Sequence, residues 1–588
     1  MDYNWQIWQP DTEQADACIR LEKELAISHQ SALLLARRGI TSAAEAREYV
    51  RPRLESLHDP FLMKDMAKAV ERLQKALQTN ERIMVYGDYD VDGTTAVALV
   101  YKILSHRTRN LCFYIPDRYT EGYGISFKGI DTAKQDGCTL IVALDCGIKA
   151  VDKVEYASKS GIDFIICDHH TPGDKLPEAV AVLNMKRSDC PYPYKELSGC
   201  GVGFKLMQAL IEKEAGDKNE LWNVLPLLAM SIASDIVPLT GENRILAYYG
   251  LKQLNTSPSI GIKCLMDVAG ITDKHITISD LVYKIGPRIN ASGRMHSGAY
   301  AVELLLSENE EEAKAKADEI NSYNTERRDF DNQTKEEALQ LLAQDPDNNK
   351  KATTVVYSPG WHKGVIGIAA SRLIETFYRP TIVLTDSEGG IISGSARSVN
   401  GFDIYSAIDS CRDLLTNFGG HLFAAGLSMK KENLDKFKQR FETYVQEHIT
   451  DEQKQPSLEI EQEIALDDIT PQFFNIIRHL EPFGPQNPRP LFLTSNLINN
   501  RYTKRVGKTG EHLRLDVTDR KAAITGIAFS KGDMALHLQN GNAADVCYNL
   551  EENTYNNITT IQMMVQDIKL CSTKETHRDL HAAEAVSK

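Results

Sequence analysis

The sequence lacks the features of a membrane-bound or exported protein. None of its apolar runs reaches the roughly 20 residues that a membrane-spanning helix requires. The first residues, MDYNWQIWQPDTEQ, contain neither the basic flank nor the apolar core of a secretory signal. Eleven cysteines are scattered without any C-x-x-C pair, which argues against a structural zinc site and for a reducing compartment. We therefore expect a cytoplasmic protein with no membrane partner.

The overall composition is that of an ordinary globular protein, with 42% hydrophobic and 25% charged residues. At 588 residues the chain is too long for one hydrophobic core, so we expect three or four domains. The formal net charge of −14 would normally count against a nucleic-acid partner. However, the stretch from Arg501 to Lys521 carries seven basic residues against three acids, so a local basic track is compatible with the acidic total.

Three aspartates alternate in the stretch VYGDYDVDGTTA (85–96), at Asp88, Asp90 and Asp92. Carboxylates this close repel one another unless a cation, a proton or water offsets them, and a divalent metal is the usual solution. The spacing also opens a calcium-binding EF-hand loop, but Leu99 stands at the twelfth position, where that loop needs a Glu. The preceding RIMVY favours a buried strand rather than the helix of an EF-hand. A surface turn rich in Asp remains the alternative, and the rest of the chain must decide.

Four apolar runs, separated by helix-like segments, each end in an aspartate. They are RIMVYGD (82–88), LCFYIPD (111–117), TLIVALD (139–145) and DFIICD (163–168). This alternation predicts βαβ units and a mostly parallel sheet. Because function in open α/β sheets lies beyond the carboxyl ends of the strands, we expect Asp88, Asp145 and Asp168 to converge on one edge.

Two further segments add polar candidates to this edge. CDHHTPG (167–173) places His169 and His170 directly after Asp168. A neutral imidazole binds transition metals, whereas a charged or hydrogen-bonding one can meet a phosphate. The helix-like LLAMSIASDIVPL (227–239) closes at Asp235, which by itself is equally compatible with a simple helix-end residue. Together with the other acids it becomes a fourth contributor.

The second half of the chain indicates further domains. Residues 308 to about 345 are charged and free of Pro and Gly, which predicts a long connecting helix. A second α/β unit follows, with strands at 353–358 and 380–385 and a glycine-rich loop that can present backbone N–H groups to an anion. From Leu458 onward, short β-rich segments without regular helices predict a small barrel, for which the OB fold has the right size.

We therefore expect an α/β multidomain protein, with a parallel-sheet domain and a smaller α/β domain joined by a long helix, and a C-terminal OB-type β-barrel. The expected boundaries are an N-terminal segment at 1–45, the parallel-sheet domain at 46–300, the connecting helix at 301–350, the smaller domain at 351–450, the barrel at 457–571 and a polar tail at 572–588.

The ordered motifs resemble a known family. GDYDVDG, ALDCG, CDHH and SDIVP resemble the DHH phosphoesterase superfamily, which is named for its Asp-His-His motif. RINASGRM (288–295), SGSARS (393–398), GGHLFAAG (419–426) and LEPFGPQNPRP (480–490) are similar to the bacterial single-strand-specific 5′-to-3′ DNA exonucleases of that superfamily. The resemblance extends from about residue 45 to 570. It identifies the two α/β domains as the DHH domain and the DHH-associated domain, with an OB domain that completes a ring around single-stranded DNA.

The resemblance implies an enzyme, a metal-dependent exonuclease that releases 5′-mononucleotides from single-stranded DNA in repair and recombination. It also suggests single-strand binding protein and a helicase as partners, and we expect a monomer. Two alternatives stay open at this point. One is a DHH phosphoesterase of short oligonucleotides, cyclic dinucleotides or polyphosphate, against which the barrel argues because a small substrate needs no long track. The other is a non-catalytic DNA-binding scaffold, against which the filled ligand positions argue.

The resemblance also implies a set of metal ligands at the sheet edge. The direct ligands are Asp90, Asp92, Asp145, His169 and Asp235, with Asp145 placed to bridge two ions. Asp88 and Asp168 are either ligands or groups that orient the ligands. His170 faces the scissile phosphate or the attacking water, and Tyr86 stands where other branches of the superfamily have a histidine.

The residue types set the expected metal. A site rich in oxygen with one or two imidazoles suits manganese or magnesium better than zinc. We expect Mn²⁺, with Mg²⁺ workable, and two ions. Two such ions about 3.5–4 Å apart generate the nucleophile and stabilise both the attacking and the leaving oxygen of a phosphodiester.

Candidates for DNA contacts lie outside this cluster. Arginine suits bidentate phosphate contacts, which favours Arg118, Arg288 and Arg397. Ser395, His362 and His421 are added by the resemblance and by their glycine-rich settings. In the barrel, Tyr502 offers an aromatic face on which a base can stack.

Overall fold

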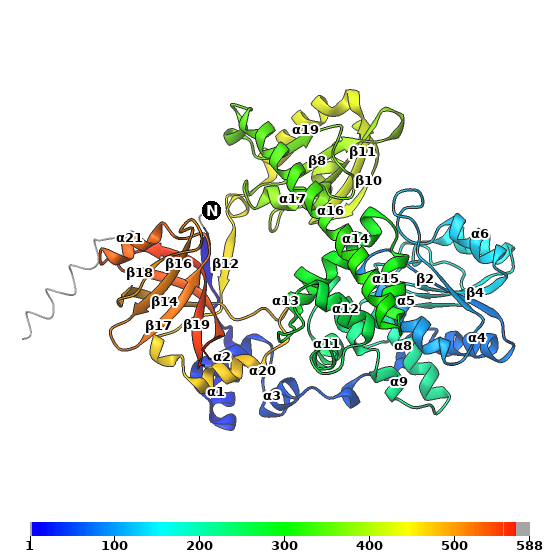
Figure 1. Ribbon diagram of the computed structural model, residues 1–588, viewed down its shortest axis with the longest axis horizontal. Helices are drawn as coiled ribbons and strands as arrows, with labels where there is room; N and C mark the ends of the chain where they lie inside the picture. Colours follow the sequence, from blue (N-terminus) through cyan, green and yellow to red (C-terminus); the bar gives the residue numbers. More distant parts are fainter. Residues whose placement is uncertain (1–2, 557, 572–588) are drawn as a thin grey trace, which may run out of the picture. The chain divides into compact units, whose positions relative to one another are not determined.

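The computed structural model describes residues 3–556 and 558–571, so the polar tail expected at 572–588 lies outside the described residues. The chain forms two compact units (Figure 1). The larger unit comprises Pro52–Lys454 together with Gly484–Gln486, and the smaller unit comprises the rest of the described chain. Within the described residues, no helix is long and apolar enough to cross a membrane.

A five-stranded parallel sheet forms the centre of the first half of the larger unit. Its strands are β2 (Arg82–Gly87), β3 (Leu111–Tyr114), β4 (Cys138–Leu144), β5 (Asp163–Cys167) and β6 (Ala181–Leu183), in the order β3-β2-β4-β5-β6. All four neighbouring pairs are parallel. The predicted strands at 82–88, 111–117, 139–145 and 163–168 are therefore confirmed, and β6 is an addition.

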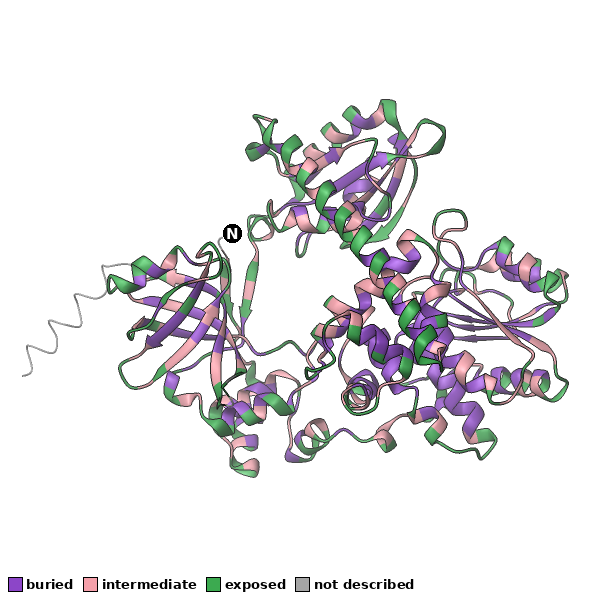
Figure 2. Ribbon diagram, in the orientation of Figure 1, coloured by how far each residue is buried: buried purple, intermediate pink, exposed green. Residues whose placement is uncertain are grey.

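Helices cover both faces of this sheet, which is why its strands are apolar on both sides. Along β2, Ile83 and Val85 join one core with residues of α4 (Met66–Gln78), α5 (Val91–Ser105) and α8 (Gly199–Lys213). The alternate residues Met84 and Tyr86 join a second core with α6 (Phe127–Gln135) and α7 (Val151–Lys159). Figure 2 shows the buried residues concentrated on the strands and on the facing sides of these helices.

A group of helices continues the first core. It contains α9 (Asn219–Trp222), α10 (Leu225–Ser234), α11 (Gly241–Leu254), α12 (Ile260–Val268), α13 (Ile278–Asp280), α14 (Gly286–Met295) and α15 (Ala299–Leu306). The next helix, α16 (Glu310–Ala343), is 34 residues long and begins at the N-cap Asn309, whose side chain accepts hydrogen bonds from two backbone N–H groups. Three glutamates lie in its first turn, where their negative charges interact favourably with the positive end of the helix dipole and stabilise the helix. The predicted long helix is thus confirmed.

The second α/β part of the larger unit has a mixed five-stranded sheet. Its strands are β7 (Thr354–Tyr357), β8 (Thr381–Asp386), β9 (Ile391–Arg397), β10 (Leu415–His421) and β11 (Ala424–Lys430), in the order β10-β11-β9-β8-β7. Only the β7–β8 pair is parallel among these described strands. The helices α17 (Ile366–Ile374), α18 (Ile404–Asp409) and α19 (Leu434–His448) pack around it.

The smaller unit is built on a seven-stranded sheet. Its strands are β13 (Gln462–Glu463), β14 (Phe492–Asn499), β15 (Lys504–Val506), β16 (His512–Thr518), β17 (Ala523–Ala528), β18 (Ala544–Tyr555) and β19 (Ile558–Leu570), and its helices are α20 (Pro471–His479) and α21 (Met534–Gln539). The order is β13-β14-β18-β19-β17-β16-β15, and an additional β14–β16 pairing closes the five strands β14, β18, β19, β17 and β16 into a barrel. The expected OB-type barrel is confirmed.

The N-terminal residues belong to the barrel unit. The strand β1 (Asn4–Ile7) pairs in parallel with β12 (Ser457–Ile460). Three helices follow, namely α1 (Thr12–Leu25), α2 (His29–Arg37) and α3 (Ala43–Val50). Each of them contributes at least one buried side chain to the core that α20 and the barrel strands also form. In addition, Arg38 forms a buried ion pair with Glu461 at 2.5 Å. No motif in the sequence indicates this association, because it joins residues more than four hundred positions apart.

Candidate metal and phosphate site

The three predicted aspartates do converge at the carboxyl edge of the parallel sheet. Asp88, Asp145 and Asp168 each follow directly after a strand, namely β2, β4 and β5, and these strands are neighbours in the sheet. All three side chains are buried, with exposed fractions of at most 2%. Parallel strands end at the same edge, so the topology alone brings together carboxylates that are up to 80 positions apart.

The turn after β2 adds two more carboxylates. Asp90 is the N-cap of α5, where its side chain accepts a hydrogen bond from the N–H of Gly93 at 3.1 Å. A Cβ at Gly93 would lie 2.4 Å from the carbonyl oxygen of Asp88, so this turn requires glycine. The alternating aspartates are therefore a strand end, a helix cap and a first-turn residue in one tight connection, and not a surface turn.

Asp92 is held by the start of another helix. Its two oxygens accept hydrogen bonds from the N–H groups of Gly199 and Cys200 at the N-terminus of α8, at 2.7 and 2.8 Å. The hydroxyl of Ser231 on α10 donates a third at 2.7 Å. These donors and the positive end of the α8 dipole stabilise the ionised carboxylate and fix its orientation.

His169 lies at the centre of the acids. Its Nε2 is 3.2 Å from Oδ1 of Asp145, 3.5 Å from Oδ2 of Asp235 and 3.9 Å from Oδ2 of Asp92. Asp235 reaches this point as the C-cap of α10. Two overlapping groups, Asp92–His169–Asp235 and Asp145–His169–His170, each bring their ligand atoms within 4.8 Å of one another. Four elements from separate parts of the sequence thus supply one cluster.

Several atoms of this cluster have no hydrogen-bond partner within the described part of the chain. They are Oδ1 of Asp145, Oδ2 of Asp235 and both ring nitrogens of His169, and all of them are buried. Unpaired buried polar atoms are costly, and native proteins retain them where a ligand completes them. The donor set of carboxylate oxygens and one imidazole is the set that Mn²⁺ and Mg²⁺ accept. These residues therefore fit a divalent-metal centre.

The electrostatics agree with this assignment. Burial and neighbouring carboxylates raise the pKa of Asp235 to about 9 and that of Asp88 to about 8. The same causes raise the pKa values of Asp90 and Asp145. Such shifts mean that the folded chain places more negative charge here than it can neutralise, so a cation is the natural counterpart. Burial also lowers the pKa of His169, which keeps its ring in the neutral form that binds metals.

Asp168 differs from Asp145 and Asp235 because both of its oxygens are already hydrogen-bonded, and it differs from Asp92 because it belongs to neither of the two groups of ligand atoms around His169. Oδ2 accepts a hydrogen bond from the N–H of Ile148 at 2.8 Å, and Oδ1 accepts one from the N–H of His169 at 2.7 Å and lies 2.7 Å from Nδ1 of His170. Burial alone raises its pKa, but the bond to His170 and the backbone donors hold the pKa below its usual value. This pattern favours the role of orienting the two histidines over that of a direct metal ligand.

His170 stands at the open side of the cluster. Its Nε2 is 3.2 Å from the hydroxyl of Tyr123, and its ring is 43% exposed. Burial lowers its pKa, but the Asp168 carboxylate outweighs this and holds the pKa above its usual value. A pocket of about 220 Å³ opens beside it, with Lys149 and Lys153 in its lining. A partly charged imidazole beside a basic pocket can receive a phosphate oxygen.

The backbone at two positions, Asp145 and Gly199, allows the elements of the site to lie close together. Asp145 has a φ of 58°, a left-handed conformation that is strained for a residue other than glycine. A Cβ at Gly199 would lie 2.5 Å from Cβ of Asp145, so only glycine allows α8 to approach this closely. Tyr86 supports the same region, since its buried hydroxyl donates to the carbonyl of Gly124, whose N–H lies 3.4 Å from Oδ1 of Asp88.

A second cluster in the larger unit consists of arginines. Arg118 lies over the ring of Tyr89 at 4.7 Å, and Arg397 on β9 donates to Oγ of Ser395 at 3.0 Å. The third member is Arg294, which donates to the carbonyl of Gly364 at 2.7 Å. None of the three arginines forms an ion pair with a described carboxylate.

The arginines act on one another electrostatically. Burial, followed by the charges of Arg118, Arg327 and Arg397, lowers the pKa of Arg294 to about 10. Burial and the charge of Arg118 also lower the pKa of Arg397. Like charges that are close together and lack a carboxylate partner fit an anion such as a phosphate.

Three other predicted contact residues have different surroundings. Arg288 donates to Asn321, to the Lys284 carbonyl and to the Val268 carbonyl, so it connects α14 with α16 and with the end of α12. The ring of His362 stacks on Phe330 at 5.3 Å. His421 is exposed at the end of β10, where its Nδ1 accepts from the N–H of Phe423. Their roles in DNA binding remain predictions.

In the barrel unit, aromatic and basic side chains are exposed together. Tyr502 is 69% exposed between β14 and β15. Lys504 and Arg514 are direct cross-strand partners, and both are exposed. Like charges placed opposite each other destabilise a sheet, so this pair is suited to an anionic partner. Phe529, at the end of β17, adds a second exposed aromatic ring.

Sequence reasoning did not single out several residues that the fold brings to these clusters. Arg294 lies within the RINASGRM motif quoted above, and an arginine in that motif was the one indication of a phosphate contact. Tyr123 contacts both the Asp145 carbonyl and His170 but lies in a loop that resembles any other. Ser231 and Gly199 carry no recognisable signal in the sequence. Ser231 donates to Asp92 and Gly199 leaves room for Asp145, and both of these acids are distant in sequence.

Comparison with known proteins agrees with this architecture. The DHH family N-terminal domain matches residues 82–232, the DHHA1 domain matches 348–447, and the RecJ OB domain matches 460–567. The single-stranded-DNA-specific exonuclease RecJ of Bacillus subtilis is 35% identical over 564 residues, which cover 96% of this chain and 70% of that protein.

Two crystal structures of RecJ from Thermus thermophilus share the fold. The complex with Mn²⁺ has a TM-score of 0.81 at 27% identity and covers 97% of this chain and 80% of that one. The complex with Mg²⁺ has a TM-score of 0.76 at 26% identity and covers 97% and 79%. Relatives that share this fold therefore bind Mn²⁺ or Mg²⁺, the metals that the donor set described above fits. The chain belongs to the RecJ family of single-stranded-DNA-specific exonucleases, within the DHH superfamily.

Proposed function

We propose that this chain is a metal-dependent exonuclease that degrades single-stranded DNA from the 5′ end to 5′-mononucleotides, in DNA repair and recombination. The observation that carries the proposal is the carboxylate cluster in which Oδ1 of Asp145, Oδ2 of Asp235 and both ring nitrogens of His169 lack hydrogen-bond partners in the described chain. A phosphodiester resists hydrolysis because its own charge repels hydroxide, and a cluster that holds divalent cations overcomes that repulsion.

Asp90, Asp92, Asp145, His169 and Asp235 are the proposed metal ligands, with Asp145 shared between two ions. Asp88 completes the carboxylate set, and Asp168 orients His169 and His170. When bound, Mn²⁺ or Mg²⁺ ions would activate water and stabilise the developing charge on the phosphate. The hydrogen bonds that hold Asp92 support this assignment, because they fix a ligand before the metal arrives.

His170 is the proposed catalytic side chain next to the phosphate. Its Nδ1 is held by Asp168 at 2.7 Å, and the hydroxyl of Tyr123 lies 3.1 Å from Nδ1 and 3.2 Å from Nε2, so the ring is fixed beside the pocket. Because Asp168 keeps the pKa of His170 above its usual value, the ring can donate a hydrogen bond or a proton to a phosphate or leaving oxygen.

The arginine cluster supports the proposed polarity. Arg118, Arg294 and Arg397, with Ser395, offer donors to a terminal 5′-phosphate, which carries more charge than an internal phosphodiester. The internal bonds of these groups to Tyr89, Gly364 and Ser395 fix the guanidinium planes. Arg288, His362 and His421 are proposed as further contacts along the strand.

The barrel supplies grip on the DNA in this proposal. We assign catalysis to residues 46–300, the connection to 301–350, phosphate binding to 351–450 and strand binding to 457–571. The exposed Tyr502 and the Lys504–Arg514 pair support a track in which bases stack and phosphates meet positive charge. Single-strand binding protein and a helicase that supplies free ends are the proposed partners of a monomeric, cytoplasmic enzyme.

Digestion of end-labelled oligonucleotides tests the proposal. Single strands labelled at either end, and the matching blunt duplexes, are incubated with Mn²⁺ or Mg²⁺, and the products are resolved at nucleotide resolution. We expect the 5′ label to appear first as a mononucleotide, with little attack on the duplex. Early loss of the 3′ label, equal digestion of duplex, or cleavage restricted to dinucleotides and cyclic dinucleotides would contradict it. An Asp145→Asn variant controls for a contaminating nuclease.

A further inference from the structure

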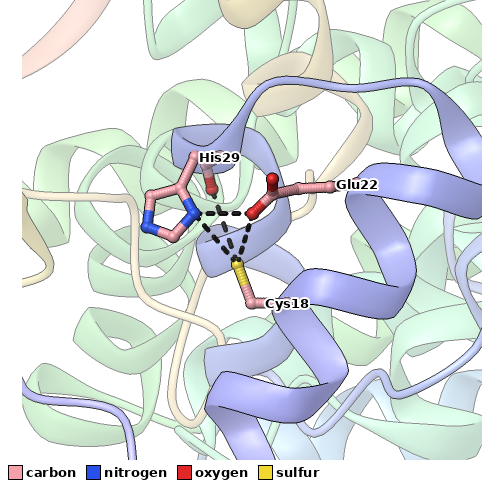
Figure 3. Close-up of side chains that lie close together, drawn as sticks. All are labelled: Cys18, Glu22 and His29. Atoms are coloured by element: carbon pink, nitrogen blue, oxygen red, sulfur yellow. Dashed lines mark hydrogen bonds and ion pairs between the residues drawn. The ribbon is translucent and has the colours of Figure 1, made fainter.

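Three side chains of types that can bind metals, Cys18, Glu22 and His29, lie close together where α1 is followed by α2 in the smaller unit (Figure 3). Cys18 and Glu22 are four positions apart on α1, so they lie on the same face of that helix. The chain then turns at Ala26, which has a φ of 51°, and His29 begins α2. The turn directs the imidazole back toward the two α1 side chains, as Figure 3 shows.

The donor atoms already have much of the spacing of a tetrahedral site. Sγ of Cys18 is 3.5 Å from Nδ1 of His29 and 3.3 Å from Oε1 of Glu22. With metal–sulfur bonds of about 2.3 Å and metal–nitrogen or metal–oxygen bonds of about 2.0–2.1 Å, neighbouring donors in a tetrahedron lie roughly 3.3–3.6 Å apart. Only Nδ1 of His29 and Oε1 of Glu22, now hydrogen-bonded at 2.6 Å, must separate, and both belong to flexible side chains.

Exposure makes the site accessible from one side. Cys18 is 1% exposed, whereas the side chains of Glu22 and His29 are 35% and 60% exposed. A buried sulfur beneath two solvent-facing ligands leaves a path for the ion and room for a water molecule as fourth ligand. By contrast, a structural hydrogen-bond cluster requires no opening to solvent.

We propose that Cys18, Glu22 and His29 bind one transition-metal ion of the zinc type, which joins α1 to α2. On binding, the S–H bond of Cys18 breaks, its proton passes to solvent, and a sulfur–metal bond forms. The hydrogen bond from the thiol to Glu22 and the one between His29 and Glu22 are replaced by bonds to the ion. Thiolate and imidazole are softer ligands than the carboxylates at the sheet edge, so this site selects zinc or cobalt over manganese or magnesium.

The chemistry of the two centres allows them to be measured separately. The ligand set proposed at the sheet edge contains no sulfur, whereas Cys18 supplies a thiolate. Cobalt(II) bound by a thiolate shows a ligand-to-metal charge-transfer band in the near ultraviolet, and cobalt bound only by oxygen and nitrogen does not. This readout does not depend on nuclease activity.

The test uses the full chain with Asp145→Asn, stripped of metal and titrated with Co²⁺. We expect the charge-transfer band to grow until one ion per chain is bound at this site, and to disappear when Zn²⁺ is added. Cys18→Ser and His29→Asn should each abolish the band or weaken Co²⁺ binding by at least about tenfold. Because His29 is mostly exposed, its variant keeps the test valid if replacing the buried cysteine disturbs folding.

Cys264→Ser is the matched control, since Cys264 is also a buried cysteine but belongs to none of the metal-ligand groups among the described residues. It should retain the band in full. Absence of the band in the parent, or a band that persists in both the Cys18→Ser and the His29→Asn variants, would overturn the proposal and leave a hydrogen-bonded cluster without metal.

Discussion

Two buried charged clusters in the larger unit differ in whether their charges are neutralised within the chain. In the first, Lys205 on α8 contacts Glu242 on α11 at 2.7 Å, and both residues are at most 1% exposed. Glu242 also accepts hydrogen bonds from the N–H of His58 and the hydroxyl of Tyr192, while Lys205 donates to the His58 carbonyl and to Gln208. Neither charged group is left without a partner.

The second cluster, at the carboxyl edge of the parallel sheet, is also largely buried, but no lysine or arginine among the described residues forms an ion pair with its carboxylates. Asp145, Asp235 and His169 keep atoms that have no hydrogen-bond partner among the described residues, and the pKa values of the two carboxyls are raised. The difference teaches that burial alone does not identify a site. A charge that the fold satisfies itself holds elements together, whereas a charge that the fold leaves unsatisfied requires something from outside.

The largest expected effect comes from removing an unsatisfied charge. Asp145→Ala should lower the exonuclease rate on the order of a thousandfold or more, because the carboxylate that we propose is shared between two ions is lost. The metal-free protein should keep its free energy of unfolding or gain stability, since repulsion in the cluster falls. Rates from end-labelled single strands and chemical denaturation measure the two quantities. A variant that digests DNA at more than a few per cent of the parent rate in Mn²⁺ would show that Asp145 is not the bridge.

Removing a satisfied charge should have the opposite pattern. Glu242→Gln should lower the free energy of unfolding by about 3–5 kcal/mol, because Lys205 stays buried without a counter-charge. The exonuclease rate per folded molecule should not change. Urea unfolding in the presence of EDTA provides the measurement, and the double variant Lys205→Met with Glu242→Leu should recover stability. Equal loss of activity and stability would remove the distinction between the clusters.

Asp168 lies within the acidic cluster but is satisfied, so it sharpens the comparison. Asp168→Asn should weaken Mn²⁺ binding about 10–100-fold, because His169 and His170 lose the group that orients them. Raising the Mn²⁺ concentration should restore most of the activity. Isothermal titration with Mn²⁺ and the metal dependence of the rate measure this. If excess Mn²⁺ restores nothing, Asp168 acts directly on the reacting groups and does not merely orient them.

An exposed residue outside both clusters should affect neither metal binding nor folding. Tyr502→Ala should weaken binding of a long single strand by at least about 1 kcal/mol, since a stacking face is lost. Fluorescence anisotropy at fixed salt measures the affinity, and Tyr248→Ala, which changes an exposed tyrosine on α11, serves as control. Unchanged affinity for oligonucleotides of every length would exclude Tyr502 from the track.

The last prediction concerns the pH dependence of the metal-free protein. Asp88 and Asp235 have folded pKa values of about 8 and about 9, above the unfolded value near 4. The folded state therefore binds more protons across this window, so the stability from these groups is present at low pH and is lost as the pH rises toward 9. Asp235→Asn should flatten the slope, whereas Lys205→Met should not. A free energy of unfolding that rises with pH, measured by urea unfolding in EDTA, would contradict the predicted fall in stability.

The elements of the catalytic part follow from local pattern. β2, β4 and β5 are apolar runs closed by aspartate, and α16 is a long stretch without Pro or Gly. Their positions could be read from the sequence because strand and helix propensity depend on neighbours in the chain. The convergence of Asp88, Asp145 and Asp168 also followed, since parallel strands share an edge.

The role of each acid did not follow from pattern. Asp145 and Asp168 occupy the same position after adjacent strands, yet one oxygen of Asp145 has no hydrogen-bond partner among the described residues, whereas both oxygens of Asp168 are hydrogen-bonded. The difference depends on Ile148 and His170, whose positions come from loop geometry. Likewise, Arg118, Arg294 and Arg397 could be recognised as arginines but not as one cluster.

The sequence by itself determined the α/β class, the order of the domains and the set of acids and histidines from which a metal centre could form. Only the tertiary structure decided that one oxygen each of Asp145 and Asp235 lacks a hydrogen-bond partner in the described chain, that the N-terminal helices join the barrel unit, and that Cys18 meets Glu22 and His29 in a chain without a C-x-x-C pair. The physical reason is that propensity and periodicity are local properties. Whether a buried charge has a partner is set by contacts between residues far apart in the chain.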